Sequence, residues 1–61
     1  MTKSEQREIV SLAMYHAAGL TDCVARGLSA LIRAARSKKS RAALVEYAQV
    51  FNVTHHPEFI I

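Results

Sequence analysis

Apolar residues recur at intervals of three and four along most of this sequence, and this spacing restricts the fold more than any other feature. Such spacing places the apolar side chains on one face of an α-helix. The chain holds only two glycines and one proline, which is too few for a β-rich fold with many tight turns. We therefore predict an all-α fold of three helices that forms a single helical domain over residues 1–61.

The first predicted helix covers residues 3–18. Thr2 is followed three residues later by Glu5, which is the spacing of a capping box, and Ser4 is the alternative cap. Gly19 is the candidate for its C-terminal stop, because glycine adopts the left-handed conformation there without steric cost. The apolar stripe of this helix, widened by Val10 and Met14, consists of Ile9, Leu12, Ala13, His16, Ala17 and Leu20.

The second predicted helix covers residues 21–37, and Thr21 or Asp22 can cap the free amide groups of its first turn. Gly27 lies in its middle, at a cost of about 1 kcal/mol relative to alanine. We interpret Gly27 as a point where two helix backbones approach closely, the alternative being a tolerated surface glycine. The apolar stripe is Val24, Leu28, Leu31, Ile32 and Ala35, and the opposite side is Asp22, Arg26, Ser29, Arg33 and Arg36.

The third predicted helix covers residues 41–52, with Ser40 as its cap and Asn52 at its end. Its apolar stripe is Leu44, Tyr47, Ala48 and Phe51. The polar stretch 37–40 separates it from the second helix. An alternative is one long helix from 21 to 51, since lysine, arginine and alanine are all good helix formers; we favour the break.

The C-terminal tail, residues 53–61, turns around Pro57 and ends in three apolar residues, so we expect it to pack on the domain or on a second subunit. A chain this short buries only about 60% of the surface of its unfolded form. We therefore predict that homodimerisation completes the core. The predicted core residues are Leu12, Leu28, Leu31, Leu44, Tyr47 and Phe51, and the residues predicted for self-association are Leu28, Leu31, Tyr47, Phe51, Phe59 and Ile60.

The formal net charge is +3, and most of the positive charge falls in one block without any acidic residue between Asp22 and Glu46. Such a block can contact phosphate, an acidic protein surface or an anionic membrane. The alternative is a solvated helix end, where cations complement the negative end of the helix dipole. The candidate partner- or nucleic-acid-binding residues are Arg26, Arg33, Arg36, Lys38, Lys39 and Arg41.

The sequence contains no constellation typical of catalysis or of metal binding. Asp22 is the only aspartate, and no Gly-x-Ser-x-Gly motif exists for a nucleophile. His55 and His56 are adjacent, so their side chains diverge, and Cys23 is too distant in sequence to join them. We expect His16 at the edge of the core and Cys23 as a small buried hydrophobe. We therefore predict no enzyme activity, no cofactor and no metal.

Charged residues near the start of the chain interrupt any early apolar run, so the sequence predicts no secretory signal. The longest apolar runs are also far below the roughly 20 residues that a membrane span needs. We expect a cytoplasmic protein without a membrane span.

Residues 44–54, LVEYAQVFNVT, resemble a stretch common in repressor-type helix-turn-helix domains, in which an alanine-containing helix runs into an Asn-Val-Ser/Thr turn. This resemblance covers about a fifth of the chain. It implies a recognition helix after Thr54. The residues that follow, 55–61, contain Pro57 and no lysine or arginine, which departs from the pattern of a recognition helix.

These observations favour a small non-enzymatic helical regulator or adaptor that binds, and can inhibit, another protein, in the size class of phage-type modulators. The alternative hypothesis is a nucleic-acid-binding transcriptional regulator that uses the basic block 26–41 to contact phosphates, with a strongly salt-dependent affinity.

Overall fold

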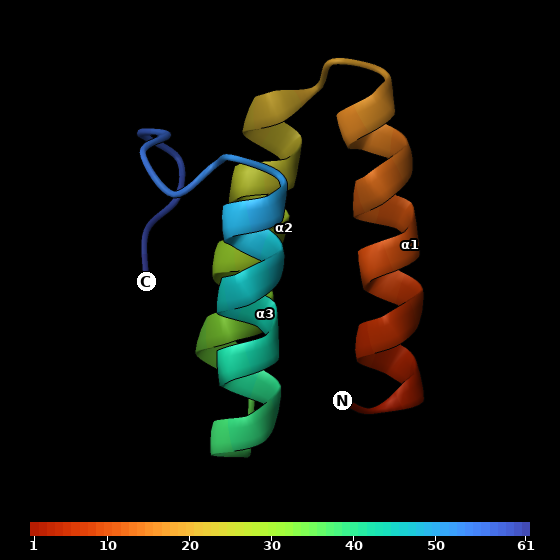
Figure 1. Ribbon diagram of the computed structural model, residues 1–61, viewed down its shortest axis with the longest axis vertical. Coiled ribbons are helices and arrows are strands. Elements are labelled where there is room, and N and C mark those ends of the chain that lie inside the picture. Colours follow the sequence, from red (N-terminus) through yellow and green to blue (C-terminus); the bar gives the residue numbers. More distant parts are fainter.

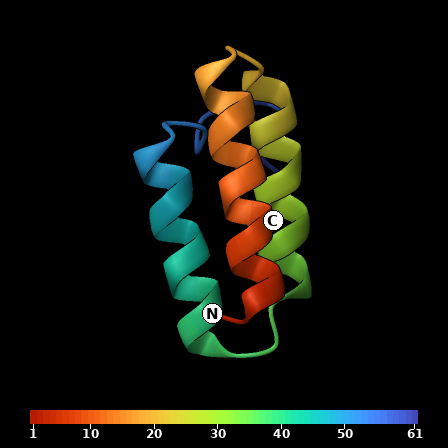
Figure 2. The same ribbon diagram turned by 90° about the vertical axis from the view of Figure 1, so that its right-hand side faces the viewer.

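The computed structural model describes residues 1–61 and contains three α-helices, α1 (Lys3–Ala17), α2 (Thr21–Ala34) and α3 (Lys38–Val50), which confirms the predicted all-α fold (Figure 1). The chain reverses direction after α1 and again after α2. As a result, α1 and α3 run parallel to each other, and α2 runs antiparallel to both (Figure 2). The tail after α3 folds back on the side of α2 and α3 that faces away from α1.

Helices α1 and α3 each have a side-chain cap at the N-terminus. The Glu5 N–H donates to Thr2 Oγ1 at 3.1 Å and the Thr2 N–H donates to Glu5 Oε1 at 2.8 Å, so the predicted capping box is confirmed. For α3, the Ser40 N–H donates to Ser37 Oγ at 3.1 Å. The third helix therefore begins at Lys38 and not at residue 41, and the prediction that Ser40 caps it is wrong, because Ser40 lies inside the first turn.

The C-terminal ends of α1 and α3 share one geometry. Gly19 has a φ of 82° and Asn52 a φ of 59°, the left-handed conformation expected one residue beyond a helix cap. The Leu20 N–H donates to the Tyr15 carbonyl at 2.9 Å, and the Val53 N–H donates to the Ala48 carbonyl at 3.1 Å. Both stop residues are confirmed, and the two helices end one and two residues before the predicted positions.

The break between α2 and α3 is confirmed, although α2 ends at Ala34 and not at residue 37. Ala35 leaves the helix with extended backbone (ψ of 130°) and is only 7% exposed. Burial of this methyl group against the core turns the chain before the polar residues begin. At the other end of α2, Leu20 occupies the cap position without a side-chain hydrogen bond, so the prediction that Thr21 or Asp22 caps the helix is wrong.

The core is one cluster of ten buried apolar residues: Ile9, Leu12, Val24, Ala25, Leu28, Ile32, Ala35, Leu44, Ala48 and Val53. Three of the six predicted core residues, Leu12, Leu28 and Leu44, belong to it. The other three, Leu31, Tyr47 and Phe51, are half-buried and pack against it. Ala25 and Val53, which the periodicity did not single out, are completely buried.

Gly27 of α2 lies against the Leu12 side chain of α1. A Cβ atom at this position would lie 2.5 Å from Leu12 Cδ2 and 3.3 Å from Leu12 Cδ1, well inside van der Waals contact. Gly27 is therefore not a surface glycine, and the close approach is that of the Leu12 side chain of α1 to the α2 backbone. Leu12, itself only 4% exposed, fills the space that a larger residue would need.

The predicted apolar stripe of α1 is buried only at Ile9 and Leu12. Its other members, together with Val10 and Met14, are exposed. The reason is that the backbone of α1 packs along α2 and not along α3. Two side-chain contacts join the ends of α1 to the α3 region: Ser40 Oγ donates to Glu5 Oε1 at 3.2 Å, and the rings of His16 and Phe51 lie 5.1 Å apart between centroids.

The tail packs on α2 through Ser29. The Ile60 N–H donates to Ser29 Oγ at 2.9 Å, and Ser29 Oγ lies 2.7 Å from the Ala25 carbonyl to which it donates. Ser29 is 1% exposed, so its predicted place on the polar side of the helix is wrong, because the tail covers it. Phe59 is half-buried against the core, and Ile60 remains 61% exposed.

Candidate functional site

Five of the six predicted basic residues lie at the end of the molecule where α2 ends and α3 begins. Because α1 also begins at this end, Lys3 joins them, which the sequence did not reveal. Arg26 lies apart, about two helical turns from Arg33, and its guanidinium is 3.9 Å from Cys23 Sγ. We call the exposed group at this end the basic end: Lys3, Arg33, Arg36, Lys38, Lys39 and Arg41.

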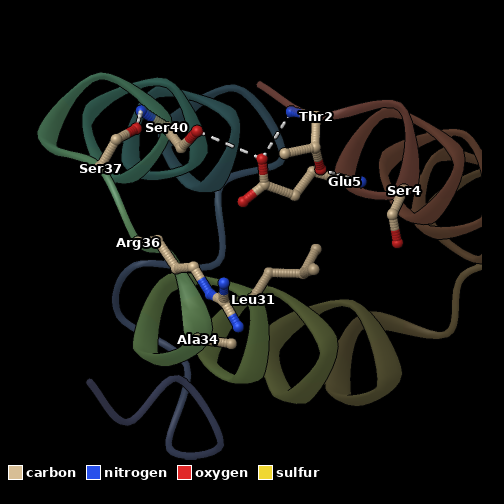
Figure 3. A pocket seen from close by; sticks show the side chains of 8 residues that line it. All are labelled: Thr2, Ser4, Glu5, Leu31, Ala34, Arg36, Ser37 and Ser40. Carbon is tan, nitrogen blue, oxygen red and sulfur yellow. Dashed lines mark hydrogen bonds between the residues drawn. The ribbon is translucent and has the colours of Figure 1, made fainter.

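A cleft of about 370 Å³ opens at the basic end, between the start of α1, the end of α2 and the start of α3 (Figure 3). The Glu5 carboxylate lies inside it, with Ser40 on one side and Thr2 on the other. The hydrogen bond from the Thr2 N–H, followed by that from the Ser40 hydroxyl, lowers the pKa of Glu5 below its ordinary value. The ionised Glu5 thus provides the anion that two helix N-termini favour, and the cleft joins α1 to α3.

A second groove, of about 350 Å³, lies between α1 and α3 and is lined mainly by apolar side chains. Val10 follows Gln6 by four residues and Met14 follows Val10 by four, so the three share one side of α1. Figure 2 shows the two parallel helices that border this groove. The groove is lined by Met1, Gln6, Ala43, Glu46, Tyr47 and Val50. We use the name α1–α3 face for this groove together with the exposed Val10 and Met14 farther along α1, which do not line it.

The α1–α3 face exposes large apolar side chains on both helices. Val10 is 62% exposed, Met14 69% and Val50 75%. Tyr47 is half-buried, and its ring stacks on that of Phe51 with 6.2 Å between centroids. Helical spacing predicts Val10 and Met14 as part of the core stripe. Nothing in the local sequence distinguishes a residue that packs on α2 from one that is exposed to solvent.

The residues predicted for self-association do not form one surface. Leu28 is completely buried within the chain, and Leu31 lines the cleft at the basic end. Tyr47 and Phe51 lie toward α1. The remaining two, Phe59 and Ile60, lie on the tail side, where Ser29 fixes the chain.

The histidines and the cysteine are dispersed. No three His, Cys, Asp or Glu side chains lie close enough together to hold a metal ion. His16 is exposed beside Phe51, Cys23 is half-buried, and His56 Nδ1 accepts a hydrogen bond from the Glu58 N–H at 3.0 Å. None of the three helices is long and apolar enough to cross a membrane.

The stretch that resembles a helix-turn-helix is not followed by a second helix. The third helix ends at Val50, and residues 51–61 form turns and an irregular end. The recognition helix that the resemblance implies is therefore missing. No protein-family model, curated protein or solved structure matches the chain.

Proposed function

We propose that this protein is a small non-enzymatic helical regulator or adaptor that acts by binding another protein through its α1–α3 face. The observation that carries the proposal is the exposure of three large apolar side chains, Val10 and Met14 on α1 and Val50 on α3, of which Val50 lines the groove between the two helices. Contiguous exposed apolar surface on a small protein marks an interaction site. Complete burial of one such side chain in a partner stabilises a complex by about 1.5–3 kcal/mol.

The test compares proteins captured from source cells by the tagged wild-type chain, by Val10→Glu and by Ser11→Glu. Both variants add one negative charge to an exposed position of α1, but only Val10 lies on the α1–α3 face. We expect a partner that wild type and Ser11→Glu retain and Val10→Glu loses, measured by quantitative mass spectrometry. The same set of captured proteins with all three chains would overturn the proposal.

We also propose that the chain forms a homodimer through a surface separate from the α1–α3 face. The thin core, with 12 of 61 residues buried, supports it, and Ile60 and Ile61 on the tail side are 61% and 63% exposed. We expect Ile60→Ser to shift the chain from dimer to monomer in sedimentation velocity. A wild-type monomer at micromolar concentration with a cooperative melt would contradict the dimer.

The second candidate function is nucleic-acid binding by the basic end. Six exposed cations gather there, while Glu5, the carboxylate in the cleft, already accepts two hydrogen bonds. Binding that neutralises phosphates weakens steeply with salt, with a slope of about −0.9 per phosphate contact. We expect duplex DNA to bind at about 50 mM salt and to lose affinity in the double variant Lys38→Glu with Lys39→Glu.

The matched control for this candidate compares two single variants that change the net charge equally, Lys39→Glu at the basic end and Arg26→Glu away from it. Equal loss of DNA affinity in these two variants, or no binding by wild type at about 50 mM salt, would remove the nucleic-acid candidate.

A further inference from the structure

A third cavity, of about 490 Å³, opens where the end of α2, the start of α3 and the end of the tail come together. Four residues line it: Ile32, Arg33, Arg41 and Ile61. We call it the arginine cavity. Figure 1 shows the end of the chain beside α2 and α3, on the side that faces away from α1. The arginine cavity shares no lining residue with the groove between α1 and α3.

The two isoleucines give the arginine cavity an apolar part. Ile32 belongs to the core cluster and is only 3% exposed, so the cavity reaches the core. Ile61 is 63% exposed and leaves most of its surface in water. A ligand that covers these side chains removes apolar surface from water, which favours binding.

The two arginines give the same cavity a positive part. Both are exposed, and Arg41 Nη2 donates a long hydrogen bond of 3.5 Å to the Ala35 carbonyl, which links Arg41 to the end of α2. A guanidinium group has five N–H donors, so most donors of Arg41 remain for a ligand. No acidic side chain lines the cavity, because the Glu5 carboxylate lies in the other cleft, together with Arg36.

We propose that the arginine cavity binds a small amphiphilic anion, a ligand with a carboxylate or phosphate head group and a short alkyl chain. The head group would accept hydrogen bonds from Arg33 and Arg41, because guanidinium groups match the geometry of both oxyanions. The alkyl chain would contact Ile32 and Ile61. Small-molecule sites commonly have volumes of about 300–1,000 Å³, and the cavity lies in this range. This inference goes beyond the proposed function, since the α1–α3 face contributes no residue to the cavity.

The mixed lining favours an amphiphilic anion over two simpler ligands. A nucleic acid would contact the guanidinium groups through its phosphates and would leave the isoleucines unused. A purely apolar ligand would exclude water from two cations without pairing them, and burial of an unpaired charge is costly. Only a ligand with both parts complements all four side chains.

The experiment titrates the full chain with octanoate and with octyl phosphate and follows the backbone amide signals by NMR. The two ligands share the alkyl chain, so the tighter one identifies the preferred head group. We expect saturable shifts at residues 32, 33, 41 and 61, and binding at least about tenfold tighter than that of acetate. Each buried methylene group tightens binding by up to about fourfold, so hexanoate should lie between acetate and octanoate. Octylammonium, with the opposite charge, should not bind.

Matched variants then locate the ligand. We expect Arg33→Gln and Arg41→Gln each to weaken octanoate about tenfold or more. Arg26→Gln and Lys39→Gln, which remove the same charge from the same two helices outside the cavity, should weaken it much less. All four positions are exposed, so circular dichroism is expected to show the same helix content throughout. Ile61→Ser should reduce the dependence of affinity on alkyl chain length.

Four results would overturn this inference. Equal affinity for acetate and octanoate would show attraction by charge alone, and equal affinity for octylammonium and octanoate would show apolar contact alone. Equal weakening by Arg26→Gln and Arg33→Gln would mean that the net charge, and not the cavity, binds the anion. Signals of residues 33, 41 and 61 that shift with protein concentration and not with octanoate would show that a second copy of the chain covers the cavity.

Discussion

Helices α1 and α2 have nearly the same length and very different surroundings. α2 buries five of its 14 residues, and α1 buries two of its 15. α1, α3 and the tail all pack on α2, whereas the backbone of α1 packs on α2 alone. The comparison shows that α2 organises the fold and that α1 leaves one side exposed.

The largest expected effect is at the centre of α2. Leu28 is completely buried, and Leu28→Ala should cost about 2–5 kcal/mol of unfolding free energy. A single core of this size supplies only about 3–5 kcal/mol in total, so we expect the variant to be largely unfolded by circular dichroism. Met14→Ala, at an exposed position of α1, should change stability by less than about 0.5 kcal/mol. Similar melting temperatures of Leu28→Ala and Met14→Ala would contradict the difference in burial between α2 and α1.

The next effect concerns the tail. Ser29→Ala removes the acceptor of the Ile60 N–H, and an unmade buried hydrogen bond costs about 1–3 kcal/mol. We expect faster hydrogen exchange at the Ile60 amide together with a lower melting temperature. Ser11→Ala, an exposed serine of α1, is the control. Unchanged exchange at Ile60 would mean that Ser29 does not fix the tail.

A smaller effect is expected where α1 and α2 meet. Gly27→Ala gains about 1 kcal/mol of helix propensity, and overpacking against Leu12 costs about 1–3 kcal/mol. We therefore expect a net destabilisation of about 1 kcal/mol in urea unfolding. In a Leu12→Val background, which relieves the contact, the same substitution should be neutral or stabilising. An equal effect in both backgrounds would contradict the close approach.

The smallest effect is a pH dependence at the start of α1. The pKa of Glu5 is lowered in the folded chain, mainly by the Thr2 N–H. Its contribution to stability is therefore fully present above its ordinary pKa of 4.5 and is lost as the pH falls through the lowered value. We expect the stability difference between wild type and Glu5→Gln to shrink on acidification below about pH 4.5. A difference that does not change between pH 7 and the acid range would show that Glu5 makes no such contribution.

Features encoded within a few residues could be predicted, and features that depend on distant segments could not. The Thr2–Glu5 box, the Gly19 stop and the Asn52 stop each involve residues no more than five apart. The burial of Ser29, in contrast, depends on a tail about 30 residues later. Local sequence fits a cap at Ser37 as well as at Ser40; in the structure Ser37 caps α3, and the Ser40 hydroxyl donates to Glu5, 35 residues away.

The candidate site also combines features set by nearby residues with features set by distant segments. The basic block 26–41 is visible in the sequence, but Lys3 joins it only because α1 starts where α3 starts. Val10 and Met14 fit the helical period of Ile9 and Leu12, and periodicity alone does not reveal that α3 stays away from them. The α1–α3 face therefore emerges only when all three helices are placed.

The limited burial of α1 has a consequence for local unfolding of this protein. Apart from its packing on α2, α1 makes the Glu5–Ser40 hydrogen bond at one end and the His16–Phe51 contact at the other, and it contributes Ile9 and Leu12 to the core. Regions with few buried contacts open at lower free energy than the global unfolding of a domain. Because α1 buries only two of its 15 residues, we expect its amide hydrogens to exchange at a lower opening free energy than those of α2.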